Sequence, residues 1–297
     1  MPDSVESLDP GIGMYCSALA GDKNVIKKIE GICASEKPTF STTSAWRYED
    51  DVGIFIPELN SHLIYSLISQ QRANHRWEGF ECPGPNCTSM GPVMSLGALG
   101  LNTQNIESIT LSSYQAVSGA GREAVVEWLR QRETGEIVGE DKKQFDRNVI
   151  PKIDGEIAKV QKEMRKILTG PNLKIDARCI RVPVEYGHIV SMFVRTKEVY
   201  DISEIPKRID VFNDQCKRNL GNLFSSPEKT MELSGEYGPQ PLRDIEKYGG
   251  MCTFIGQIGP LDSERGLACV VGSNNLKKGA AKGSVQLAEY LHRERFF

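Results

Sequence analysis

The sequence of 297 residues contains no apolar run long enough to span a bilayer, and its start, Met-Pro-Asp-Ser at 1–4, lacks the pattern of a secretory signal peptide. It also lacks an excess of one charge, since 36 Lys and Arg residues oppose 39 Asp and Glu residues. Neither a nucleic acid nor a membrane is therefore expected as a partner. We expect a soluble, cytoplasmic protein.

The cysteines lack the spacing of a metal site or of a redox pair. There is no Cys-x-x-Cys pair, and no histidine lies beside a cysteine at zinc-binding spacing. The eight cysteines are Cys16, Cys33, Cys82, Cys87, Cys179, Cys216, Cys252 and Cys269. We therefore expect free thiols in a reducing compartment and no metal site.

A third absence concerns dinucleotide binding. A dinucleotide-binding domain usually begins with a strand, a Gly-x-Gly-x-x-Gly turn and a helix whose N-terminus receives the pyrophosphate. No such pattern occurs near the N-terminus, because Gly11 and Gly13 precede the first predicted strand instead of following it. The pyrophosphate of a dinucleotide cofactor is thus left without its usual anchor.

Strand and helix patterns alternate through the chain, as in one half of a doubly wound sheet. In the N-terminal part we predict strands at 11–19, 39–41 and 52–56 and helices at 22–33 and 57–71. Beyond it we predict helices at 87–99, 122–132, 156–168, 203–213 and 276–293, strands at 106–116, 174–184, 188–196, 251–257 and 266–271, and a charged surface segment at 133–147.

One cysteine stands out by its context, because Pro-Asn-Cys-Thr-Ser at 85–89 opens an apolar run. The pattern predicts that Cys87 lies at a helix N-terminus, where free backbone N–H groups and the helix dipole lower the pKa of a thiol. The alternative is that Cys87 is a buried residue that only packs in the core, as most cysteines in apolar segments do.

Four segments resemble motifs of the aspartate-semialdehyde dehydrogenase family: Pro-Asn-Cys-Thr at 85–88, Ser-Tyr-Gln-Ala-Val-Ser-Gly-Ala-Gly at 113–121, Arg-Val-Pro-Val-x-x-Gly-His at 181–188 and Leu-Lys-Lys-Gly-Ala-Ala at 276–281. Shorter matches at 17–19, 44–47 and 57–60 extend the resemblance over nearly the whole chain. It implies an α/β fold with an incomplete Rossmann-like N-terminal lobe at 1–86. An α+β catalytic and dimerisation domain with a large mixed sheet would follow at 87–273. A C-terminal helix at 274–297 would pack back on the first lobe.

The resemblance implies three catalytic residues. Cys87 would be the nucleophile that attacks an aldehyde or an acyl phosphate, and His188 would be its base. Gln115 would hold the acyl carbonyl through its amide. Without the resemblance, His188 reads as a surface or capped residue after a Tyr-Gly turn, and Gln115 as an ordinary polar residue of a strand.

It also implies five substrate-binding residues: Arg181, Glu156, Lys159, Arg47 and Asn86. Arginine suits a substrate carboxylate, and in the family the Glu contacts the substrate amino group while the Lys and a second Arg contact phosphate. The alternative for Arg181 is an ion-paired charge at a strand edge. For Glu156 and Lys159 it is a solvated helix face that continues through Glu163 and Lys166.

The implied cofactor is NADP(H), or none at all. The contacts that the resemblance leaves are Ser17, Ser118, Gly119 and Asn275. Two glycines, Gly84 and Gly283, stand where the family places asparagine, and glycine supplies no side-chain amide.

Three functions follow from these observations. The first is aspartate-semialdehyde-dehydrogenase-type chemistry on a small amino-acid aldehyde or acyl phosphate. The second is a cofactor-independent cysteine enzyme that catalyses acyl transfer, condensation or cyclisation in specialised biosynthesis. The third is a non-catalytic homologue that assembles with a full-length relative. A homodimer or homotetramer is expected.

The resemblance begins partway into the family's N-terminal domain. Two explanations are open: a truncated form of an ordinary dehydrogenase, or a diverged member that works without NADP(H). The acidic leader at 1–10 runs straight into a predicted strand, which favours a natural start.

Overall fold

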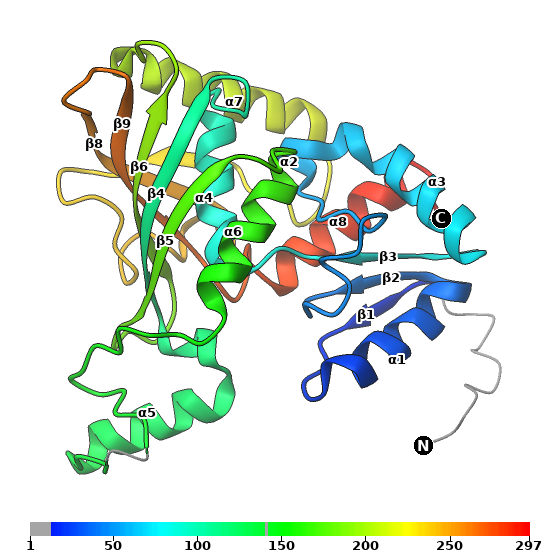
Figure 1. Cartoon of the computed structure of the whole chain (residues 1–297), viewed down its shortest axis with the longest axis horizontal. Coiled ribbons are helices and arrows are strands. Elements are labelled where there is room, and N and C mark those ends of the chain that lie inside the picture. The colour runs from blue at the N-terminus through cyan, green and yellow to red at the C-terminus, as the bar shows by residue number, and fades with distance from the viewer. Residues whose placement is uncertain (1–12, 140–141) are drawn as a thin grey trace.

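The computed structural model describes residues 13–139 and 142–297 (Figure 1). The leader at 1–10, Gly11 and two residues of the charged segment at 133–147 lie outside the described residues. Two sheets organise the chain, a small parallel sheet in the N-terminal part and a large mixed sheet in the rest. The α/β fold class with a large mixed sheet is confirmed.

The small sheet has the order β1-β2-β3, and its strands run parallel. Its strands are β1 (Tyr15–Ser17), β2 (Pro38–Ser41) and β3 (Phe80–Pro83). Helix α1 (Lys23–Glu36) begins after Asp22, whose carboxylate accepts from the backbone N–H of Asn24 at 2.9 Å. The C-terminal helix α8 (Ala281–Arg293) packs against the sheet, where Leu287 and Leu291 join a core with Phe40 and Phe80.

The third strand of this sheet differs from the prediction. Residues 52–56 form no strand, because the Asn60 side chain satisfies their backbone: it accepts from Ile56 N at 2.8 Å and donates to Ile54 O at 2.9 Å. The predicted helix at 57–71 is divided into α2 (Pro57–Asn60), the 3₁₀ turn η1 (Ser61–Leu63) and α3 (Ile64–His75). Strand β3 takes the third position instead. It was not predicted, because one of its four residues is a proline, which is unusual within a strand.

The large sheet has the order β5-β4-β6-β9-β8-β7. Two neighbouring pairs, β4 with β5 and β7 with β8, run parallel, and the other pairs run antiparallel. The strands are β4 (Ile106–Gln115), β5 (Lys174–Arg181), β6 (His188–Thr196), β7 (Met231–Leu233), β8 (Thr253–Pro260) and β9 (Gly266–Ser273). The short strand β7 was not predicted.

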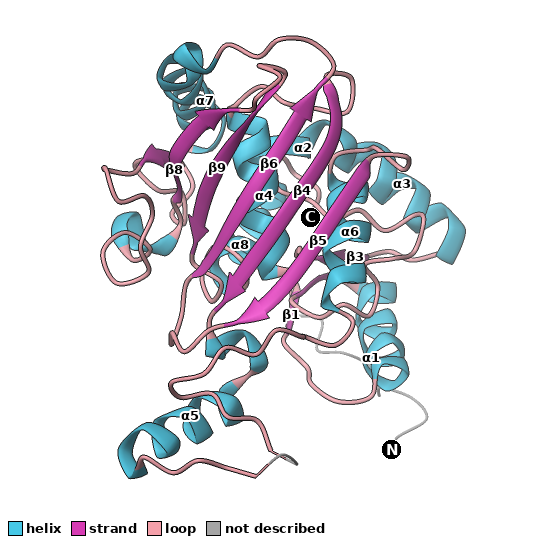
Figure 2. Cartoon of the chain, turned by 60° about the vertical axis from the view of Figure 1, so that its left-hand side comes forward, coloured by secondary structure: helices cyan, strands magenta, loops and turns pink. Residues whose placement is uncertain are grey.

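Helices cover one face of this sheet, and the other face is open in the single chain (Figure 2). The covered face carries the main core, to which Met94, Ile109, Met164 and Val194 belong. On the strands, Tyr114 and Phe193 remain 39% and 48% exposed. The helices that contribute to this core are α4 (Cys87–Ala98), α6 (Glu156–Ile167) and α7 (Ile205–Leu220). Helix α5 (Arg122–Thr134) lies beyond the end of the sheet (Figure 2). The 3₁₀ turns are η2 (Val117–Ala120), η3 (Ile202–Glu204) and η4 (Lys247–Gly250).

The two largest shifts in helix boundary concern α7 and α8. Helix α7 continues to Leu220, beyond the predicted end at 213, and α8 begins at Ala281, not at 276. The residues before α8 form a turn in which Lys278 is held by Glu58 at 2.6 Å. Both side chains of this ion pair are buried, and the pair ties the turn to α2. Over the ranges that the structure describes, no helix combines the length and apolar character needed to cross a bilayer.

Candidate active site

The start of α4 and the start of β6 meet at a cysteine and a histidine. Cys87 is the first residue of α4, and Asn86 caps the helix by accepting from the backbone N–H of Thr88 at 2.6 Å. His188 is the first residue of β6, and its Nε2 lies 3.3 Å from Cys87 Sγ. The predicted place of Cys87 at a helix N-terminus is confirmed, and the structure brings the two residues together.

His188 is held on both ring nitrogens. Its Nδ1 accepts from the backbone N–H of Ala116 at 3.2 Å, while Nε2 faces Cys87. The side chain is 1% exposed, so the surface alternative for His188 is wrong. Burial, with the Arg181 charge as a second cause, lowers the pKa of His188 to about 3.

The environment of Cys87 does not lower the pKa of its thiol. Burial raises its pKa to about 11, and Glu156 adds to this increase, whereas Arg47 and Arg181 oppose it. The sequence predicts the opposite direction, because the helix N-terminus was considered without the desolvation of the sulfur.

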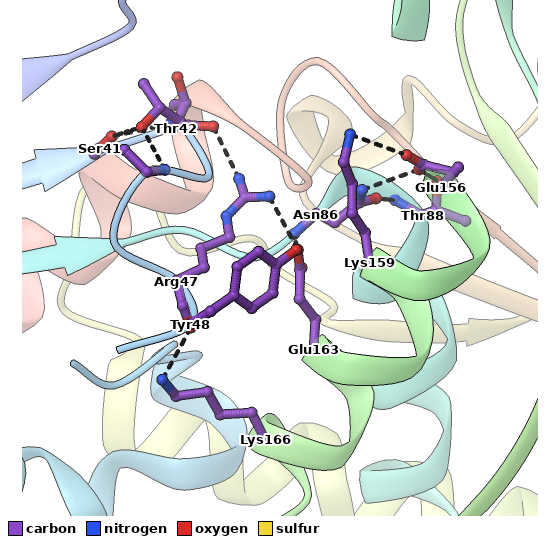
Figure 3. Close-up of polar contacts among 12 residues, drawn as sticks. Ser41, Thr42, Arg47, Tyr48, Asn86, Thr88, Glu156, Lys159, Glu163 and Lys166 are labelled. Carbon is purple, nitrogen blue, oxygen red and sulfur yellow. Dashed lines mark hydrogen bonds and ion pairs between the residues drawn. The ribbon is translucent and has the colours of Figure 1, made fainter. Parts of the chain in front are cut away.

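Glu156 gathers the polar groups beside the cysteine (Figure 3). Its Oε1 accepts from Asn86 Nδ2 at 2.9 Å, from Thr88 Oγ1 at 3.1 Å and from Gln115 Nε2 at 3.3 Å. Lys159 lies 3.7 Å from Glu156 Oε2, and its own side chain is 42% exposed. The structure thus brings Asn86, Gln115, Glu156 and Lys159 to one place next to Cys87.

Glu163, which the sequence analysis assigned only to a solvated face, is fully buried. It accepts from Asn86 N at 2.5 Å, from Arg47 Nη1 at 3.2 Å and from Tyr48 Oη at 3.1 Å (Figure 3). The solvated alternative for this helix face is therefore wrong for both glutamates. The high helical amphipathicity of 156–167 is the signal that could have found it, since one side of the helix must face the core.

Two arginines are close enough to Cys87 for their charges to act on its thiol. Arg47 donates to Thr42 O at 2.8 Å as well as to Glu163, so its guanidinium is already engaged. Arg181, the last residue of the edge strand β5, donates from Nη1 to Ala116 O at 2.6 Å and is 5% exposed. Burial lowers the pKa of Arg181, and no ion pair of Arg181 occurs among the described residues, so the ion-paired alternative finds no support.

The predicted cofactor residues divide into two groups. Asn275 donates to Ser118 Oγ at 3.0 Å and accepts from Gly187 N at 2.7 Å, which joins the turn before α8 to the turn before His188. A Cβ on Gly119 would lie 2.6 Å from Arg181 Nη1 and 3.0 Å from His188 Cε1, so this position needs a glycine for packing alone. Ser17 belongs to a different cluster, where its hydroxyl donates to the buried Glu30 at 2.7 Å.

A cysteine at the start of a helix, within hydrogen-bond reach of a histidine at the start of a strand, is the arrangement of an α/β enzyme that forms covalent intermediates on sulfur. Comparison with known proteins identifies the family. Residues 98–278 match the family model "Semialdehyde dehydrogenase, dimerisation domain". The chain belongs to the aspartate-semialdehyde dehydrogenase family, and the family prediction is confirmed.

The relatives agree with this assignment over most of the chain. The aspartate-semialdehyde dehydrogenase of Archaeoglobus fulgidus is 34% identical, over 86% of this chain and 70% of the relative. That of Methanothermobacter thermautotrophicus is 29% identical, over 98% of this chain and 84% of the relative. The crystal structure of aspartate semialdehyde dehydrogenase II from Vibrio cholerae has a TM-score of 0.78 at 25% identity, and covers 96% of this chain and 81% of that one. A structure from Candida albicans, solved with NADP, shares the fold with a TM-score of 0.76 at 24% identity, over 96% of this chain and 78% of that one.

Proposed function

We propose that the chain acts through Cys87 on a small amino-acid aldehyde or acyl phosphate, as an enzyme similar to aspartate-semialdehyde dehydrogenase. The observation that carries this proposal is the Cys87–His188 contact of 3.3 Å at the start of α4. The names of the relatives support the substrate class. We also propose that the catalytic and dimerisation domain spans residues 87–273, between the N-terminal lobe at 1–86 and the C-terminal helix at 274–297.

The chemistry begins with attack of the Cys87 sulfur on the substrate carbonyl carbon. With an acyl phosphate, a carbon–sulfur bond forms, the carbon–oxygen bond to phosphorus breaks, and phosphate departs with that electron pair to leave a thioester. With an aldehyde, a carbon–sulfur bond forms as the π bond of the carbonyl breaks, and the thiol proton passes by way of His188 to the carbonyl oxygen, which gives a thiohemiacetal. Gln115 Nε2 would donate to the carbonyl oxygen in either adduct, in exchange for its bond to Glu156.

Substrate recognition would come from the charged side chains around the sulfur. We assign the substrate carboxylate to Arg181, the amino group to Glu156, and phosphate to Lys159 and Arg47. Lys159 is the most exposed of these four and the one that an incoming anion reaches without breaking a short contact. Arg47 must first share its guanidinium with Glu163.

NADP(H) remains the cofactor that the family resemblance suggests, but the described residues do not fit a complete site for it. None of the three strands of the small sheet is followed by a Gly-x-Gly-x-x-Gly turn. The Asn275 amide and the Ser17 hydroxyl are both bonded within the chain. We therefore derive no step through the cofactor.

Self-association follows from the open face of the large sheet. Tyr114 and Phe193 are exposed there, and the matched family model is a dimerisation domain. We propose a homodimer, or a homotetramer built from two dimers. Light scattering on the purified chain measures the assembly mass directly, and a monomer at micromolar concentration would exclude both.

The proposed function is tested by incubation of the chain with the side-chain acyl phosphate of an acidic amino acid, which carries the carboxylate and the amino group assigned to Arg181 and Glu156 and needs no cofactor to react. We expect one phosphate released per chain and one acyl group on the peptide that contains Cys87, and neither product with Cys87→Ser. Absence of acylation would contradict the proposal and favour the non-catalytic homologue. A parallel titration with NADP(H) distinguishes the two enzymatic functions, because acylation without any cofactor binding at millimolar concentration favours the cofactor-independent enzyme.

A further inference from the structure

Glu163 on α6 connects the proposed phosphate site to the start of α4 (Figure 3). Its two carboxylate oxygens have separate partners. Oε2 accepts from the backbone N–H of Asn86 at 2.5 Å. Oε1 accepts from Arg47 Nη1 at 3.2 Å and from Tyr48 Oη at 3.1 Å. One oxygen thus holds the residue before the nucleophile, while the other holds the arginine to which we assign phosphate.

The guanidinium of Arg47 is not saturated with acceptors, although it is buried. Its bond to Glu163 is 3.2 Å long, which is longer than the 2.8 Å bond from Nη2 to Thr42 O. Its Nε is buried and has no hydrogen-bond partner among residues 13–139 and 142–297. A buried donor without an acceptor costs free energy, and a bound anion reduces this cost. Arg47 is therefore prepared for a further acceptor.

The backbone of Arg47 is fixed independently of its side chain. Lys166, on the turn of α6 that follows Glu163, donates from Nζ to Arg47 O at 2.9 Å and to Glu49 O at 2.5 Å (Figure 3). The side chain of Arg47 can therefore change its partner while the loop that carries it stays in place.

Tyr48 gives Glu163 a second donor on the oxygen that Arg47 uses. Burial, with the Glu163 charge as a second cause, raises the pKa of Tyr48, so its hydroxyl keeps its proton at neutral pH. The hydroxyl therefore remains a donor to Oε1 when Arg47 leaves. A buried carboxylate oxygen that keeps one hydrogen bond avoids the full cost of desolvation.

We propose that Glu163 is a positioning residue that competes with phosphate for Arg47, and that Tyr48 lowers the cost of this exchange. Inorganic phosphate, or the phosphate group of an acyl phosphate, takes Nη1 of Arg47 from Glu163. Glu163 keeps its bonds to Asn86 and Tyr48, so the start of α4 is held in the same position before and after the exchange. This inference rests on the proposed function, which assigns phosphate to Arg47.

The test measures the binding of inorganic phosphate to the full chain by calorimetry, which requires no turnover. In Glu163→Gln the charge that holds Arg47 is lost, so we expect phosphate to bind about tenfold more tightly. In Tyr48→Phe the exchange leaves Oε1 without a donor, so phosphate should bind about fivefold more weakly. The second variant changes no charge, so a general electrostatic effect on the anion does not explain its result.

Tyr248→Phe is the matched control, because the hydroxyl of Tyr248 on η4 also donates to a glutamate, Glu232, at 2.6 Å. Its phosphate affinity should equal that of the unmodified chain. Thermal denaturation of the same variants separates positioning from a purely structural role. Glu163→Gln and Tyr48→Phe should both lower the melting temperature, since each loses a buried hydrogen bond, whereas their phosphate affinities should move in opposite directions.

Phosphate affinities that move in the same direction in Glu163→Gln and Tyr48→Phe would overturn the inference. If Glu163→Gln does not fold, Tyr48→Phe decides alone, and an affinity that is unchanged or higher in this variant would overturn the inference. Absence of phosphate binding to the unmodified chain would overturn it as well. The proposed function fails by a different result, the absence of acylation at Cys87, and phosphate binding does not use the thiol, so the two failures are distinguishable.

Discussion

Two buried carboxylates of the molecule, those of Glu163 and Glu81, differ in their hydrogen bonding. At the start of α4, Glu163 accepts from Asn86, Arg47 and Tyr48. On β3, Glu81 is equally buried, yet neither of its side-chain oxygens has a hydrogen-bond partner among the described residues. Burial raises the pKa of Glu81 well above its usual value of 4.5, with the nearby Glu30 as a second cause.

The difference shows that the buried carboxylate of Glu163 fixes the positions of its hydrogen-bond partners, whereas that of Glu81 fixes no other side chain through hydrogen bonds among the described residues. Glu163 connects the residue before the nucleophile to the loop of Arg47, so removal of its carboxylate affects several groups at once. Glu81 can be accommodated as an uncharged acid, at the cost of its desolvation. Substitutions in matched pairs across the two regions should separate these roles.

The largest expected effect is on turnover, and it should distinguish Cys87 from Cys82. Cys87→Ser should lower turnover by about 10⁴-fold or more, because the nucleophile is lost, while the melting temperature stays the same. Cys82→Ser, next to Glu81 in the fully buried strand β3, should keep turnover but lower the free energy of unfolding by about 1–3 kcal/mol, because a hydroxyl is buried. Kinetics and thermal denaturation of both variants measure this, and retained activity in Cys87→Ser would remove the catalytic assignment.

The next effect concerns Glu163 itself. Glu163→Ala leaves the buried Arg47 without its carboxylate and the N–H of Asn86 without an acceptor. We expect the free energy of unfolding to fall by about 3–5 kcal/mol, measured by urea denaturation. The matched variant Glu81→Ala should lower the free energy of unfolding by less than half of this amount. Equal losses in the two variants would show that the hydrogen bonds of Glu163 add no stability.

A smaller effect with a defined pH dependence is expected for Glu81→Gln. Burial raises the pKa of the Glu81 carboxyl in the folded chain well above 4.5, so as pH rises the unfolded chain loses this proton before the folded chain does. The unmodified chain therefore loses stability with increasing pH above this point. The stability of the glutamine variant relative to the unmodified chain should therefore increase from pH 4 towards pH 7, by about 1.4 kcal/mol for each pH unit over which only the unfolded chain is ionised. A constant difference across this range would show that Glu81 is ionised when folded.

The smallest stability effect is expected on the exposed side of the site. Lys159→Met removes a charge that is 42% exposed, so the free energy of unfolding should change by less than about 0.5 kcal/mol. The KM for phosphate or for an acyl phosphate should nevertheless rise, since we assign phosphate to this side chain. An unchanged KM would leave phosphate binding to Arg47 alone.

Much of the fold followed from periodicity, and most of the site followed from motifs. The strand at 188–196 and the helix at 87–99 were predicted within one residue, because their apolar patterns are long. The apolar character of residues 52–56 predicts a strand that the structure does not form. Their backbone partners belong to the Asn60 side chain, which no local pattern reveals.

The site residues show a different limit. His188 lies 101 positions from Cys87 in the sequence, so only the family resemblance could pair them. Glu163 was overlooked because alternating charges on a helix usually mark a solvated face. The direction of the Cys87 pKa shift was missed because desolvation depends on the whole three-dimensional environment of the sulfur, which a local motif does not contain.

The buried pair of Lys278 and Glu58 also has a consequence for how the chain folds. Its partners are 220 positions apart, so the pair can form only after the N-terminal and C-terminal parts have docked. Until then both charges remain in water, and the turn before α8, whose Gly279 lies against the backbone of Cys87, is not in place. During refolding, the burial that raises the pKa of the Cys87 thiol should therefore appear in the last kinetic phase, later than the helix signal.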